Sequence, residues 1–404
     1  MSSRNNHPLV RKRRVFYIPG YDPIPPRRYR ELYRTESALQ AEISDYQISV
    51  SAKSGDGPYG WHVTSRQGGV EVSVDLDVLV WSDIVRDSMS TSIPATYLQL
   101  FRTAWTYIST GTLRRLMRLR KGPVIAALYP VGMLLAQLFL AIVLTLALSW
   151  AFRPFLGWIG MIPAVAAACG LLIWFRKLDG KLYAYYLMHD YAYSARLRGA
   201  TPNELHQRLR SFSAQIRDAL QSDVDEVLVV GHSSGAHLGV SVLADLIRAG
   251  GLRKDRPELS FLSLGQVVPM VSFLPDAQDL RADLQLLSTQ DDLTWVDVSA
   301  PGDGCSFALC DPVAVSGVAG TGKKWPLVLS AAFTQTLSPE RWEALRWKFF
   351  RLHFQYLCAF DYPERYDYFS ITAGPQTLWQ RFRDRTPSKS RVEEAVSKYT
   401  TVKA

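Results

Sequence analysis

Short runs of apolar residues recur along the chain with the length and period of β-strands. Residues 14–18 (RVFYI) are β-branched and aromatic and end at a Pro-Gly turn, which predicts a short buried strand. Residues 227–230 (VLVV) have the unbroken apolar character of a strand that is covered on both faces. Within residues 60–80, apolar and polar positions alternate from Val70 to Leu76, which is the period of a strand. Residues 259–271 and 293–298 are two further strand candidates.

Helical periodicity fills the intervals between these runs. Residues 26–44 begin with proline and carry leucine and isoleucine at helical spacing, and helices are also predicted over residues 183–198 and 202–222. Strands that alternate with helices predict the α/β class with a mainly parallel sheet, formed by residues 1–122 and 177–384. Residues 385–404 form a polar tail that we expect to fray.

Two long apolar stretches interrupt this alternation in the middle of the chain. Residues 123–152 and 155–175 contain no charged side chain, and Arg153 and Pro154 stand between them. At about 1.5 Å per residue, either stretch could span a hydrocarbon core of roughly 30 Å as a helix. A pair of buried core helices is the alternative, but such helices rarely exceed about 18 residues without a charge. We therefore predict a two-helix transmembrane hairpin over residues 123–176, with its turn at Arg153 and Pro154.

The net charge of +9 supports an association with a lipid bilayer, because basic residues gather at both ends of the predicted hairpin. By the positive-inside rule, the segments before and after it face the cytoplasm, which makes the chain an integral membrane protein, of the inner membrane in a bacterium. Nucleic acid is not an expected partner, since no zinc-finger, RNP-like or helix-turn-helix pattern accompanies the charge. Small residues at Gly157, Gly160 and 164–168 would allow a homodimer through the hairpins. The flanking basic residues are Arg114, Arg115, Arg118, Arg120, Lys121, Arg176, Lys177 and Lys181.

The motif Gly-His-Ser-Ser-Gly follows the predicted strand 227–230 directly and opens an apolar-periodic helix. A strand, a sharp turn and a helix are the context that a nucleophilic serine in a G-x-S-x-G motif requires. The turn is strained, and glycine at both outer positions avoids steric clashes around it. Ser233 is therefore the predicted nucleophile, whereas His232 is expected to turn away from the cleft and to have no catalytic role.

At these residues the chain resembles the α/β-hydrolase superfamily. More narrowly, it is similar to a set of uncharacterised bacterial membrane-associated serine hydrolase-like proteins. The narrower similarity rests on three sequence segments: GHSSGAHLG, Trp295 followed by Asp303 and Asp311-Pro312, and RLHFQYL leading into YDYF and AGP. The resemblance implies a serine, acid, histidine order along the chain and requires no cofactor and no metal.

That order places the general base after Ser233, where only His237 and His353 are available. His237 projects from the helix of the serine itself and cannot easily approach its hydroxyl, so His353 is the predicted base. The acid should follow a late strand, and Asp303, in the loop after residues 293–298, is the first candidate. Asp311 is the alternative acid. Asp297 lies inside the predicted strand and is the least suitable of the three.

Acyl transfer also needs hydrogen-bond donors for the oxyanion. The backbone N–H of Ser234 is the first expected donor, and Gly20 or Tyr21 in the loop after residues 14–18 is the second, since Pro19 has no N–H. The alternative interpretation of this Pro-Gly-Tyr-Asp segment is a simple turn. Both interpretations place this segment in the loop that follows residues 14–18.

Two other sequence patterns do not predict a binding site. Residues 317–324 come close to a phosphate-binding loop, but Lys324 stands where a magnesium-binding Ser or Thr is needed. Cys305 and Cys310 have no histidine nearby that would complete a zinc site, so the four cysteines are expected to be reduced.

Together these patterns predict a membrane-anchored serine hydrolase that acts on apolar acyl esters, of the esterase, lipase or thioesterase kind. The competing hypothesis is a non-catalytic membrane-associated scaffold with the same fold. A transporter is not expected, because the apolar helices carry no charged residue that could line an ion path.

Overall fold

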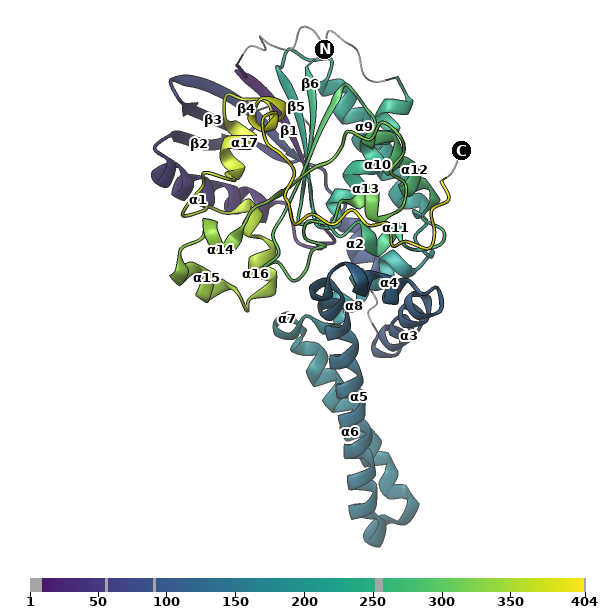
Figure 1. Ribbon diagram of the computed structural model, residues 1–404. Helices are drawn as coiled ribbons and strands as arrows, with labels where there is room; N and C mark the ends of the chain where they lie inside the picture. The colour runs from purple at the N-terminus through teal and green to yellow at the C-terminus, as the bar shows by residue number, and fades with distance from the viewer. Residues whose placement is uncertain (1–8, 55–56, 90–91, 251–256, 403–404) are drawn as a thin grey trace.

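The computed structural model describes residues 9–54, 57–89, 92–250 and 257–402. Eight strands form one sheet in the order β2-β3-β4-β1-β5-β6-β7-β8 (Figure 1). All neighbouring pairs from β4 to β8 are parallel, and β3 is antiparallel to both of its neighbours. The predicted α/β class with a mainly parallel sheet is thus confirmed. The strands are β1 (Lys12–Ile18), β2 (Gln47–Ala52), β3 (Gly60–Gln67), β4 (Val70–Val78), β5 (Glu226–His232), β6 (Glu258–Leu264), β7 (Leu293–Ser299) and β8 (Leu327–Ser330).

Helices cover both faces of the sheet, and each face has its own apolar cluster. Successive side chains of β5 alternate between the two clusters: Leu228 and Val230 enter one, Val227 and Val229 the other, and all four are 0% exposed. This explains why the central strand reads as an unbroken apolar run. On one face lie α9 (Asn203–Ala219), α10 (Gly235–Arg248) and α12 (Gln278–Ser288); on the other lie α1 (Arg27–Ser44), α17 (Tyr368–Ala373) and α18 (Leu378–Phe382).

The remaining elements are short or lie near the base of a helical arm (Figure 1). They are α2 (Ser82–Ser88), α3 (Ile93–Ser109), α4 (Thr112–Leu119), α7 (Asp179–Leu182), α8 (Ala184–Ala195), α11 (Pro269–Ser272), α13 (Pro312–Val315), α14 (Phe333–Thr336), α15 (Pro339–Leu345), α16 (Phe349–His353) and the 3₁₀ helix η2 (Gln355–Leu357).

Several predicted boundaries are wrong. The run 60–80 is two strands, because Gly68 and Gly69 both have positive φ and reverse the chain between β3 and β4. The candidate strand 259–271 ends at Leu264 and is followed by a loop and α11. The tail does not fray in its described part, since Val392 exchanges backbone hydrogen bonds with Leu309 and Asp311 and Val396 is buried.

The arm that projects from the domain consists of α5 (Lys121–Leu156) and α6 (Met161–Lys177), joined by the 3₁₀ turn η1 (Gly157–Gly160) (Figure 1). Within the described residues, Lys121–Lys177 is the one helical segment that is long and apolar enough to cross a membrane, and only 17% of its most apolar window is buried. The predicted turn at Arg153 and Pro154 is wrong, because both residues lie inside α5. The chain reverses later, at Gly157, whose φ of 57° suits glycine.

The two helices of the arm pack against each other through small residues. A Cβ on Gly160 would lie 2.7 Å from the Cβ of Phe152, and Ala164 and Ala168 are buried. These small residues therefore bring α6 close to α5 within one chain, which is a different use from the dimer contact considered above.

Candidate active site

The loops that carry the candidate residues meet at the carboxyl edge of the sheet. Strands β1, β5, β6 and β7 are neighbours and parallel, so the segments that follow them emerge side by side. The N–H of Ser233, just after β5, donates to the carbonyl of Leu264 at the end of β6 (2.9 Å), and Gly265 donates to Val298 of β7 (2.9 Å). These two hydrogen bonds hold the carboxyl ends of β5, β6 and β7 next to one another, although they are far apart in the sequence.

Ser233 occupies a strained turn between β5 and α10. Its φ is 57°, a left-handed conformation that is uncommon for a non-glycine residue. A Cβ on Gly231 would lie 2.6 Å from the carbonyl of Gly235, and one on Gly235 would lie 2.0 Å from the carbonyl of Ile18. Both outer glycines of the motif are therefore required by close backbone contacts.

Substituting Gly235 by alanine is expected to destabilise the protein by roughly 3 kcal/mol or more, because the new methyl group would overlap the backbone of β1, which cannot rotate away. Thermal unfolding in detergent, compared with the parent chain, would measure the effect. Gly180→Ala is the matched control, since its Cβ meets nothing within 4 Å. Equal stability of the two variants would contradict the tight packing of the turn.

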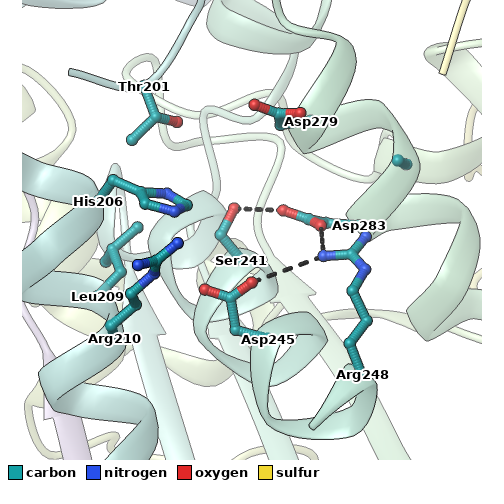
Figure 2. A pocket seen from close by; sticks show the side chains of 10 residues that line it. Thr201, His206, Leu209, Arg210, Ser241, Asp245, Arg248, Asp279 and Asp283 are labelled. Atoms are coloured by element: carbon teal, nitrogen blue, oxygen red, sulfur yellow. Dashed lines mark hydrogen bonds and ion pairs between the residues drawn. The ribbon is translucent and has the colours of Figure 1, made fainter. Parts of the chain in front are cut away.

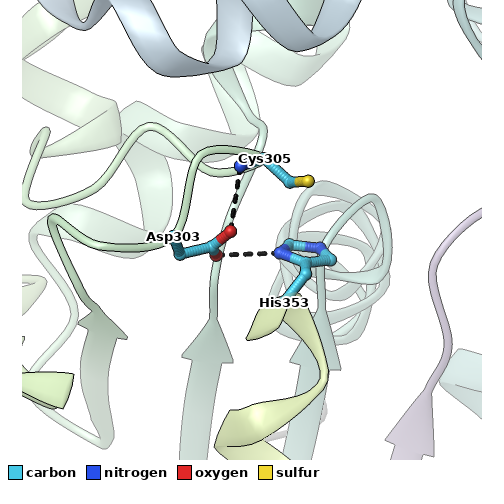
Figure 3. A group of neighbouring side chains, drawn as sticks. All are labelled: Asp303, Cys305 and His353. Carbon is cyan, nitrogen blue, oxygen red and sulfur yellow. Dashed lines mark hydrogen bonds and ion pairs between the residues drawn. The ribbon is translucent and has the colours of Figure 1, made fainter. Parts of the chain in front are cut away.

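Asp303, in the loop after β7, accepts a hydrogen bond from Nδ1 of His353 on α16 at 2.8 Å (Figure 3). Both side chains are buried. An ionised carboxylate can only accept, so Nδ1 carries the proton and the lone pair of Nε2 is left available. This is the tautomer that a general base for a serine hydroxyl needs.

Further donors hold Asp303 in its ionised form. The hydroxyl of Tyr356 donates to Oδ2 (3.0 Å), and the N–H of Cys305 donates to Oδ1 (2.9 Å). Burial by itself would raise the pKa of Asp303, but the positive charge of His353 in its protonated form and its hydrogen bond, helped by the N–H of Cys305, keep that pKa below its ordinary value. Nothing in the sequence marked Tyr356 beyond its place three residues after His353.

His232 is buried and has a structural part in the site. Its Nε2 donates to the carbonyl of His353 (2.9 Å), and the two imidazole rings are 4.7 Å apart. Burial lowers the pKa of His232 to about 3, with a smaller contribution from the charge of His353, so its ring is neutral. The hydrogen bond and the ring contact of His232 thus hold the backbone and the ring of His353 in position.

Ser233 and His353 contact adjacent residues, Leu264 and Gly265, and no hydrogen bond joins the two side chains among the described residues. Cε1 of His353 lies 3.2 Å from the position of a Cβ on Gly265, the residue after Leu264, which binds the Ser233 N–H. Bonds of this kind often tighten only when a substrate is bound.

The other candidate acids and the second histidine are engaged elsewhere. Asp311 caps α13 by accepting from Val313 and Ala314 and pairs with Lys323 at 2.6 Å, so it does not bind His353. Asp297 is fully buried in β7 and accepts from Ser263; burial raises its pKa to about 7. His237 lies on α10, and burial lowers its pKa to about 4.

The loop after β1 lies directly against the serine. A Cβ on Gly20 would be 3.0 Å from the Cβ and 3.5 Å from Oγ of Ser233. Ser234 stands at the N-cap position of α10 without a capping hydrogen bond from its side chain, and the first backbone N–H groups of a helix have no helical partner. Tyr21 is buried, and its carbonyl accepts from Tyr186 of α8. Gly20 thus lies in direct contact range of the Ser233 side chain.

Helix α8, at the base of the arm, carries an acidic residue, Asp190, that no sequence pattern marks. Asp190 lies one turn from Tyr186 and one turn from Tyr193, and both tyrosines contact Tyr21. Burial raises the pKa of Asp190 to about 7, and the charge of His353 opposes this effect. Asp190 therefore belongs to the helix that packs on the loop after β1.

The ligand atoms of Asp303, Cys305 and His353 lie within 4.8 Å of one another and could hold a metal ion (Figure 3). Both oxygens of Asp303 already accept hydrogen bonds, and burial raises the pKa of the Cys305 thiol well above its ordinary value. A protonated thiol is a poor ligand, so these side chains fit a hydrogen-bonded acid–histidine pair better. All four cysteines are free of disulfides.

A cavity of about 320 Å³ lies elsewhere, among α9, α10 and α12 (Figure 2). Its polar side chains are largely satisfied by one another: Ser241 donates to Asp283, and Arg248 pairs with Asp283 at 2.6 Å. We assign no role to it.

Comparison of the chain with models of protein families, with curated proteins and with solved structures gave no match.

Proposed function

We propose that this chain is a serine hydrolase of the α/β-hydrolase type that cleaves acyl esters. The observation that carries the proposal is a serine in a strained strand-to-helix turn whose N–H bonds to Leu264, with a buried, hydrogen-bonded Asp303–His353 pair beside the next residue, Gly265. The order of these residues along the chain and their meeting at the carboxyl edge of a parallel sheet agree with the sequence resemblance.

In this mechanism, Oγ of Ser233 attacks the ester carbonyl while Nε2 of His353 takes its proton. The N–H groups of Ser234 and of Gly20 or Tyr21 stabilise the negative oxygen. The carbon–oxygen bond of the ester then breaks, and the leaving alcohol takes the proton from His353. Water attacks the acyl-enzyme, His353 accepts its proton, and that proton returns to Ser233 as the acid leaves.

We further propose that α5 and α6 anchor the domain in a membrane, with the segments before and after them in the cytoplasm. Large apolar side chains on the arm are exposed, among them Phe139, Leu146, Trp150 and Phe155, at 65%, 65%, 79% and 84%. Such a surface is stable in lipid and costly in water. Tethering at a bilayer favours apolar acyl esters as the substrate class.

Labelling of the detergent-solubilised full chain with a fluorophosphonate tests the catalytic proposal. We expect one covalent adduct, which mass spectrometry locates on the peptide that contains Ser233, and no adduct after heat denaturation. A folded protein that remains unlabelled, or that is labelled at another serine, would overturn the proposal and favour the scaffold hypothesis.

A further inference from the structure

Helix α3 has one face that packs on the protein and an opposite, exposed face that is apolar. Leu100, Thr103 and Tyr107 are buried against the domain, and the Tyr107 hydroxyl donates to the carbonyl of Met270 (2.9 Å). The face turned away from the domain carries large apolar side chains where a soluble helix has polar ones. They are Leu98, Phe101, Trp105 and Ile108, exposed at 48%, 64%, 66% and 63%.

These four residues form one continuous stripe. At about 100° per residue, positions 98, 101, 105 and 108 fall within a sector roughly 80° wide. Phe101 and Trp105 stack on each other with ring centroids 6.5 Å apart. The stripe is therefore one surface, which we call the α3 stripe.

The position of α3 along the arm matches the level of a bilayer surface. The Tyr97 hydroxyl donates to the carbonyl of Leu134 in α5 (2.9 Å), and α3 also contacts α6 and α8 (Figure 1). Beyond Leu134, the segment 135–156 of α5 is roughly 33 Å long at about 1.5 Å per residue. That length equals the thickness of a hydrocarbon core, so α3 lies where the arm would leave it.

The charge around α3 is that of a surface that meets anionic headgroups. Neither α3 nor α4 contains an acidic residue. Exposed basic residues and an exposed tryptophan lie on α3, on α4, at the first residue of α5 and in the last turn of α6, and such residues are favoured at a membrane interface. They are Arg102, Arg114, Arg118, Lys121, Trp174, Arg176 and Lys177.

We propose that α3 lies in the surface of an anionic bilayer, with the α3 stripe in the boundary between headgroups and acyl chains. The inference rests on the proposed membrane insertion of α5 and α6, and it adds a second element that fixes how the domain sits on the lipid. Helix α3 packs on α8, which carries the Tyr186 hydroxyl bonded to Tyr21 beside Ser233. The carboxyl edge of the sheet is thereby held next to the lipid surface.

Photo-crosslinking of the full chain in mixed phosphatidylcholine–phosphatidylglycerol vesicles tests this placement. The photoreactive residue p-benzoylphenylalanine replaces Trp105, Leu146 of the arm, or Ser211, which is exposed on α9. We expect phospholipid adducts at positions 105 and 146, with phosphatidylglycerol over-represented at position 105, and a yield at position 211 that is several-fold lower.

The three crosslinking positions distinguish the placement of α3 from the membrane insertion of α5 and α6. Lipid adducts at position 146 without any at position 105 would overturn the placement of α3 and leave the membrane anchor standing. Adducts at neither position would overturn both. A cross-link from position 105 to a second copy of the chain would show that a protein contact covers the α3 stripe, which also overturns the placement.

Discussion

Substituting Ser233 by alanine is expected to lower the hydrolysis of an activated ester, such as a p-nitrophenyl ester, on the order of 10⁶-fold. That factor corresponds to about 8 kcal/mol of transition-state stabilisation. The reason is that His353 and Asp303 serve the reaction only through the hydroxyl of Ser233, so without it their hydrogen bond activates nothing. Steady-state turnover by the reconstituted full chain measures the loss.

A double variant provides a second test of this expectation, because the two rate losses should not be additive. If the three residues act as a unit, Ser233→Ala combined with His353→Ala is no slower than Ser233→Ala alone. Ser211→Ala, on the exposed side of α9, is the matched control and should retain full turnover. Activity that survives in Ser233→Ala, or losses that multiply in the double variant, would point to a different nucleophile.

The sequence predicts the elements whose signal is local. Strand β5 and the turn after it are recognisable because a strand buried on both faces is uniformly apolar and because the glycines of the turn are sterically required. Strand β8 has only four residues, which is too short to show a period. Helix α3 is missed for a different reason: its apolar stripe is exposed and its buried face includes Thr96 and Thr103, so the pattern does not mark the side that packs.

The contacts that complete the candidate site are not local, and the sequence does not reveal them. The hydrogen bond from His232 to the carbonyl of His353 joins residues 121 positions apart. The hydroxyl of Tyr186 on α8 donates to the carbonyl of Tyr21, 165 positions away in the sequence. Chain order and a family resemblance could point to Asp303 and His353, but only the fold brings these supporting groups beside them.

Substituting Asp303 by asparagine is expected to lower kcat on the order of 10⁴-fold without unfolding the protein. An amide can donate its NH₂ group toward Nδ1 of His353, and the proton of the ring then moves to Nε2. A protonated Nε2 cannot accept the proton of Ser233. Turnover and thermal unfolding, measured on the same preparation, separate this effect from a loss of structure.

Asp311→Asn is the matched control, because Asp311 was the alternative acid and is equally buried. Its carboxylate caps α13 and pairs with Lys323, so the variant should lose some stability while kcat changes by no more than a few-fold. The opposite result, a large loss of kcat in Asp311→Asn and little in Asp303→Asn, would mean that the hydrogen bond between Asp303 and His353 does not orient the base. Both variants remove one buried negative charge. A large loss of kcat in Asp303→Asn alone would therefore come from the lost contact with the imidazole of His353.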